Sequence, residues 1–146
     1  MKSNLLLKLF AFLIFASMHS SGFAQCKGFT KKACIPGLAP FIHNGQMNST
    51  ILLAGEKAEL QMIFYSGQDY RLMVCAQAIL GDVSFRLLDK NKKVVFNSKE
   101  EDYVQFWDFN VVSTQQFSIE VDVPQSSSST QLVENGCVSV LVGFKQ

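Results

Sequence analysis

Four cysteines are the residues with the clearest chemistry in this chain of 146 residues: Cys26, Cys34, Cys75 and Cys137. Zinc sites and redox centres commonly contain a Cys-x-x-Cys motif, in which two residues stand between the cysteines. This motif does not occur here. We expect disulfides Cys26–Cys34 and Cys75–Cys137. The first would staple a turn-rich segment, and the second would join two strands on which both cysteines lie off the main apolar face. The alternative pairings would tie the N-terminal segment to the sheet.

His43 is the first candidate for catalysis, because it is the only histidine after residue 24. A small hydrolase would also need a positioned nucleophile and an orienting acid. The sequence lacks the Gly-x-Ser-x-Gly motif that could supply the nucleophile, so we predict a locally bonded loop histidine and no enzymatic activity. The acidic run Glu100, Glu101 and Asp102 is a weak calcium candidate, since calcium prefers oxygen ligands. A solvated turn is the alternative, and we expect no cofactor.

Aromatic residues gather between positions 103 and 109. A period of two places Tyr103, Trp107 and Phe109 on one face of a strand, and Phe106 with Asp108 on the other. An exposed row of Tyr103, Trp107 and Phe109 could stack on sugar rings or anchor a protein partner. The alternative is that these rings pack in the core between two sheets.

The elements that must position these residues are short strands. From residue 50 onward, apolar and polar residues alternate in seven or eight runs, with turn residues every 8–12 positions. This pattern predicts an all-β protein, an antiparallel β-sandwich of the jelly-roll type, formed as a single domain over residues 25–146. Residues 25–48 contain several prolines and glycines, and we expect a loop there with at most one or two helical turns.

Composition narrows the class of protein. Hydrophobic residues make up 48% of the chain and charged residues 17%, which excludes an intrinsically disordered chain. Residues 1–24 resemble a secretory signal peptide, with an apolar run followed by Gly22-Phe23-Ala24, and a membrane anchor is the alternative. Removing this segment takes away two of the 13 basic residues and none of the 12 acidic ones, so the formal charge changes from +1 to −1. We expect export to the periplasm or the extracellular space, no remaining membrane span and no binding of nucleic acid.

Four stretches of the sequence resemble a known family. They are Gly67–Val74, Gly81–Asn91, Phe106–Phe109 and Phe117–Val121. Together they look like the bacterial pre-peptidase C-terminal domain, a GOLD-like β-sandwich, and the layout is similar to small exported proteins of Bacteroidetes-type bacteria. The resemblance covers roughly residues 55–146 and implies a non-catalytic accessory, binding or secretion role.

These observations favour an exported, non-enzymatic binding or structural module. Its partner would be a protein or a glycan. A carbohydrate-binding module that uses the aromatic residues at 103–109 is the first alternative, and a small hydrolase built around His43 is the second.

Overall fold

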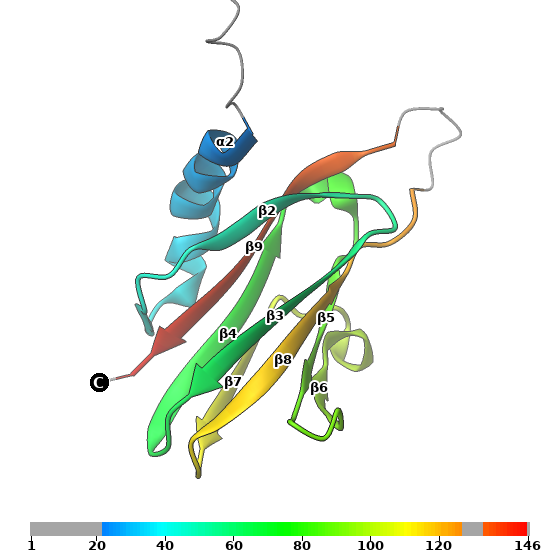
Figure 1. Cartoon of the computed structure of the whole chain (residues 1–146). Coiled ribbons are helices and arrows are strands. Elements are labelled where there is room, and N and C mark those ends of the chain that lie inside the picture. Colours follow the sequence, from blue (N-terminus) through cyan, green and yellow to red (C-terminus); the bar gives the residue numbers. More distant parts are fainter. Residues whose placement is uncertain (1–21, 127–132, 146) are drawn as a thin grey trace, which may run out of the picture.

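Alternation of apolar and polar residues folds this chain into two antiparallel sheets packed face to face (Figure 1). The computed structural model describes residues 22–126 and 133–145, so most of the predicted signal peptide lies outside the described residues. Sheet A contains β1 (Ile42–His43), β2 (Asn48–Leu53), β9 (Asn135–Phe144), β4 (Gln68–Ala76) and β7 (Phe106–Val111). Sheet B contains β3 (Lys57–Phe64), β8 (Gln115–Asp122), β5 (Ser84–Leu88) and β6 (Val94–Asn97). Two short 3₁₀ helices, η3 (Ala78–Leu80) and η4 (Ser98–Glu101), connect strands.

The order of the strands is that of a jelly roll. Sheet A runs β2-β9-β4-β7 and sheet B runs β3-β8-β5-β6, while β1 adds a two-residue pairing beside the end of β9. The chain therefore crosses between the sheets at every connection from β2 to β9 except that from β5 to β6, which are neighbours in sheet B. The prediction of an antiparallel, jelly-roll-like β-sandwich is confirmed, and the described residues contain nine strands because β1 joins the eight of the jelly roll.

The main core lies between the two sheets. Side chains with no or almost no exposed surface come from the inward positions of both layers, among them Phe64, Leu72, Phe85, Leu87 and Ile119. Stacked rings on two strands close one side of this core. Trp107 and Phe109 of β7 stack at 4.5 Å between ring centroids, and Phe96 of β6 stacks on Trp107 at 4.8 Å.

The N-terminal segment is helical, so the prediction of a loop with at most one or two helical turns is wrong. An α-helix, α2 (Gly22–Phe29), continues as a π-helix, η1 (Thr30–Cys34), and as a 3₁₀ helix, η2 (Ile35–Leu38). Pro36 does not end this run early. It occupies the first turn of η2, where a missing N–H costs no hydrogen bond.

This helical segment covers the outer face of sheet A (Figure 1). A second, smaller core forms beneath it from Cys34, Leu38, Met73, Cys75 and Leu141. Polar groups there are satisfied as well: the buried hydroxyl groups of Thr30 and Ser139 lie 2.7 Å apart, and the Thr30 hydroxyl donates to the Cys26 carbonyl. The outer face of sheet A is therefore buried beneath the helical segment.

The disulfides are Cys26–Cys137 and Cys34–Cys75, so the predicted pairs Cys26–Cys34 and Cys75–Cys137 are wrong. Cys26 in α2 and Cys34 at the end of η1 are eight residues apart along continuous helix, roughly 12 Å at the α-helical rise, which is beyond the reach of a disulfide. Cys75 and Cys137 do lie on the outer face of sheet A, off the main core, but each faces a helical cysteine instead of the other. Both bridges therefore fasten the helical segment to sheet A.

Candidate functional site

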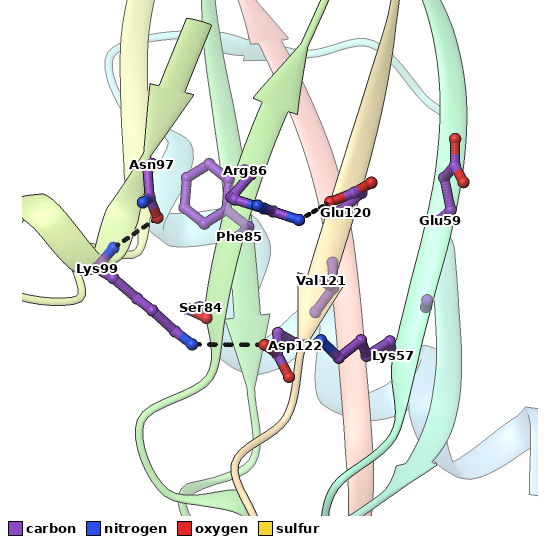
Figure 2. A pocket seen from close by; sticks show the side chains of 11 residues that line it. Lys57, Glu59, Ser84, Phe85, Arg86, Asn97, Lys99, Glu120, Val121 and Asp122 are labelled. Atoms are coloured by element: carbon purple, nitrogen blue, oxygen red, sulfur yellow. Dashed lines mark hydrogen bonds and ion pairs between the residues drawn. The ribbon is translucent and has the colours of Figure 1, made fainter. Parts of the chain in front are cut away.

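No segment among residues 22–126 and 133–145 covers the outer face of sheet B, and charged side chains stand on this face in cross-strand pairs (Figure 2). Arg86 of β5 pairs with Glu120 of β8. Asp122 of β8 forms ion pairs with two ammonium groups, with Lys57 Nζ and Lys99 Nζ each 3.4 Å from the same carboxylate oxygen. The alternation that directs apolar residues into the core places these charges on the opposite face.

These pairs line a shallow depression of about 460 Å³, which we call the sheet hollow. The turn between β5 and β6 is held by Asp89, whose Oδ1 accepts from the backbone N–H groups of Asn91 and Lys93. Lys92 in the same turn reaches Glu59 of β3 with 3.0 Å between Nζ and Oε1. The hydrogen bond from Lys92 is the largest reason that the pKa of Glu59 lies below its usual range, and a hydrogen bond from Ser118 adds to it. The lining residues are Lys57, Ala58, Glu59, Ser84, Phe85, Arg86, Asn97, Lys99, Glu120, Val121 and Asp122.

A second depression of about 430 Å³, the end hollow, opens at one end of the sandwich. Its lining includes Tyr103, Asp82, Gln125 and Glu134. It shares Ser84, Lys99 and Asp122 with the sheet hollow. The ion pair between Lys99 and Asp122 thus stands where the two hollows meet.

The three predicted aromatic ligand residues do not form one exposed row. Trp107 and Phe109 share a face, as the alternation predicts, but this face points into the sandwich and both rings pack against the main core. Tyr103 precedes β7, is 41% exposed and lines the end hollow. Core packing, the alternative reading of the sequence, describes Trp107 and Phe109, while Tyr103 stays accessible.

Arg71 is a residue that the sequence analysis did not single out. Its guanidinium group lies between the rings of Phe41 and Phe106, at 4.7 and 4.1 Å from their centroids, and binds both oxygens of Asp108 at 2.7 Å. Asp108 thereby raises the pKa of Arg71, although burial acts in the opposite direction. Arg71 also donates to the carbonyl of Ala39 at 2.9 Å, so this cluster holds the end of the helical segment against sheet A. The only sequence signal for it is that Arg71 and Asp108 both take outward positions on their strands.

The remaining candidates are separated in the fold. His43 lies in β1 on sheet A, with its Nε2 3.1 Å from the Gln46 carbonyl oxygen, as expected of a locally bonded histidine. In the acidic run, Glu100 accepts from the Asn97 amide at 2.9 Å, and Asp102 forms the left-handed end of η4. Across residues 22–126 and 133–145, no three side chains of His, Cys, Asp or Glu are grouped so that they could hold a metal ion. No helix within these ranges is long and apolar enough to cross a membrane.

Comparison with known proteins identifies no family. No family model and no curated protein sequence matches this chain. Among solved structures, the crystal structure of PliG from Aeromonas hydrophila, a periplasmic inhibitor of g-type lysozyme, is similar with a TM-score of 0.49 and 10% sequence identity. The match covers 73% of this chain and 89% of PliG. A likeness of this degree carries no argument about function, and the resemblance to the pre-peptidase C-terminal domain stays a prediction.

Proposed function

We propose that this chain is an exported, non-enzymatic binding module whose binding face is the outer face of sheet B. The observation that carries the proposal is the difference between the two outer faces. Two disulfides hold a helical segment over sheet A, whereas the outer face of sheet B is hollowed and no part of the chain that the structure describes covers it (Figures 1 and 2). A two-layer sandwich needs no further cover to stay folded, so the open face is free to meet a ligand.

The charges on this face suit recognition. Exposed ion pairs contribute only about 0–1 kcal/mol each to folding. A ligand can therefore exchange the contacts of Arg86, Glu120 or Asp122 for its own at little cost to the fold. The strands hold the backbone of these side chains in place. Less conformational entropy is therefore lost when a ligand binds.

Binding is favoured over catalysis by where the candidate groups lie. Glu120 and Asp122 are each engaged in an ion pair on the outer face of sheet B. His43 lies on the other sheet, apart from both hollows. The hydrolase alternative would need these groups in one cleft.

Export is supported by the cysteines. All four take part in disulfides, which persist in oxidising compartments such as the periplasm or the extracellular space. The apolar segment within residues 1–24 supports the same destination, as a predicted signal peptide.

A photo-crosslinking experiment in the native cell envelope tests the binding face. A benzophenone side chain at Gln116, which is exposed on β8, should form a discrete adduct, whereas one at Lys31, which is exposed on the helical segment, should not. Excess unlabelled chain should compete for the adduct, and the same excess carrying Arg86→Glu should compete poorly. Adducts that form equally at Gln116 and Lys31, or only at Lys31, would refute the assignment of the face.

A further inference from the structure

An exposed ion pair lies where the two hollows meet. Lys99 Nζ and the Asp122 carboxylate lie 3.4 Å apart, and their side chains are 49% and 35% exposed. Both residues line both hollows, and Figure 2 shows the Lys99 side chain extending from η4 across Ser84 to Asp122. Rotation of the Lys99 side chain alone would join the hollows into one elongated cleft, at the small cost of an exposed ion pair.

Tyr103 is held at the end hollow by an unusual backbone. Asp102 and Tyr103 have φ angles of 54° and 56°, in the left-handed region that bulky residues rarely adopt. Hydrogen bonds maintain this conformation: the Tyr103 N–H donates to the Ser98 carbonyl at 2.8 Å and the Val104 N–H donates to the Glu101 carbonyl at 3.2 Å. Left-handed backbone at successive residues that are not glycine costs free energy and persists where the surroundings determine it. The result is an aromatic ring that remains 41% exposed beside polar groups.

The polar lining around this ring offers both donors and acceptors. Asp82, Glu134 and Gln125 lie in the end hollow, and Arg86 and Glu120 lie in the sheet hollow. Over both hollows, acidic side chains outnumber basic ones: Asp82, Glu59, Glu120, Asp122 and Glu134 against Lys57, Arg86 and Lys99. This balance disfavours an anionic ligand and suits a neutral one that has many hydroxyl groups.

From this arrangement we infer that the ligand of the proposed binding face is a neutral oligosaccharide that lies across both hollows, with one sugar ring stacked on Tyr103. The inference rests on the proposed function and names its ligand class. A sugar ring presents an apolar C–H face to an aromatic ring and hydroxyl groups at its edge, and these hydroxyls bond to paired acids, amides and guanidinium groups. Each hollow has the volume of an ordinary small-ligand site, about 300–1,000 Å³. Lys99 turns aside when the chain of sugars bridges the hollows.

Titration of the ¹⁵N-labelled protein with chitotetraose, cellotetraose and maltotetraose, followed by NMR, tests the inference. At least one of these sugars should cause saturable shifts in amides of both hollows. Tyr103→Asn removes the ring but keeps a residue that tolerates left-handed backbone, and it should weaken binding about tenfold, which corresponds to about 1.4 kcal/mol. Tyr103→Phe keeps the ring and should bind within about twofold of the original protein, because stacking needs only the ring face.

Two further variants sharpen the result. Tyr65 is another exposed tyrosine, at 64%, and lines a different depression beside the end of β3, so Tyr65→Asn is the matched control and should bind normally. Lys99→Ala should strengthen binding of the tetrasaccharide, which no longer has to break the ion pair with Asp122. It should leave binding of the corresponding disaccharide unchanged, because a disaccharide occupies a single hollow.

Three outcomes overturn the inference: no saturable shift with any of the sugars, shifts outside the hollows, or binding that Tyr103→Asn leaves unchanged. The amide spectrum shows in the same experiment whether each variant is folded. If the sugars fail while the adduct at Gln116 persists and Arg86→Glu still competes poorly for it, the oligosaccharide is wrong and the binding face stands. If the Gln116 adduct also fails, both proposals fall.

Discussion

Removing each disulfide separately should show how firmly the helical segment is bound to sheet A. The two changes are the double substitutions Cys26→Ala with Cys137→Ala, and Cys34→Ala with Cys75→Ala. The bridges are nested, because Cys34 and Cys75 both lie between Cys26 and Cys137 in the sequence. Each double variant leaves the other bridge in place, so the loss can be measured on a folded protein.

The size of each loss follows from the loop that the bridge closes. The outer bridge spans 111 residues and the inner bridge 41. With the inner bridge intact, the outer loop shortens to about 70 residues, for which the chain-entropy model gives about 4.5 kcal/mol. For the 41-residue loop of the inner bridge alone, the same model gives a stabilisation of about 4 kcal/mol. The stabilisation is somewhat smaller when the outer bridge is also present, because that bridge already restricts the unfolded chain. We therefore expect both double variants to lose several kcal/mol of unfolding free energy, and the outer one to lose more.

Urea unfolding followed by Trp107 fluorescence gives these losses, since Trp107 is the only tryptophan and stacks inside the sandwich. Counting free thiols on the same variants tests the pairing. In the variant that lacks Cys26 and Cys137, the structure predicts no free thiol, because Cys34 and Cys75 remain bonded. Two free thiols there would mean that both bridges had been broken, as the pairing Cys26–Cys34 requires, and would refute the reasoning.

Two further predictions concern single contacts. Phe96→Ala removes the ring stacked on Trp107 and should lower the unfolding free energy by about 2–3 kcal/mol, less than the cost of deleting a fully buried phenylalanine, while the Trp107 emission moves to longer wavelength. Val95→Ala, at an exposed position of the same strand, should change neither quantity by much, and an unchanged emission in Phe96→Ala would contradict the stacking. Lys92→Ala should raise the pKa of Glu59 measured by NMR, because the Lys92 hydrogen bond is the main cause of its lowering. The ionised Glu59 carboxylate stabilises the folded protein above its unfolded pKa, and this contribution is lost as the pH falls through the folded pKa. Lys92→Ala should remove part of it, and equal titration of Glu59 in Lys92→Ala and the parent would refute this contact.

The strands could be predicted from the sequence because their signal is local. The alternation within a single strand predicts which side chains face inward, as it does for Phe117, Ile119 and Val121 of β8. The same parity correctly places Trp107 and Phe109 together, and Phe106 with Asp108 on the opposite face. Local turn residues then set the boundaries, which is enough to reach an antiparallel sandwich.

The disulfides and the helical segment could not be predicted in this way, because they depend on contacts between distant parts of the chain. Cys26 meets Cys137 only because α2 lies along β9, and nothing near either residue encodes that docking. The helix itself has a weak local signal, since Pro36 and Gly37 suggest a turn. Packing against Met73 and Leu141 offsets this tendency. Whether Trp107 and Tyr103 are buried or exposed also depends on how the two sheets close.

One signal for the covered sheet is nevertheless present in the sequence of β9. From Gly136 to Gly143 this strand contains no charged residue, and its residues are buried on both faces, which is typical of a strand with packing on either side. Gly143 even provides space for the chain that follows the helical segment, since a Cβ atom there would lie 2.7 Å from that of Phe41. By contrast, β8 places Glu120 and Asp122 at successive outward positions. The strand without outward charges is the covered one and β8, which carries them, lies on the open face, so the contrast between these two strands agrees with the proposed binding face on sheet B.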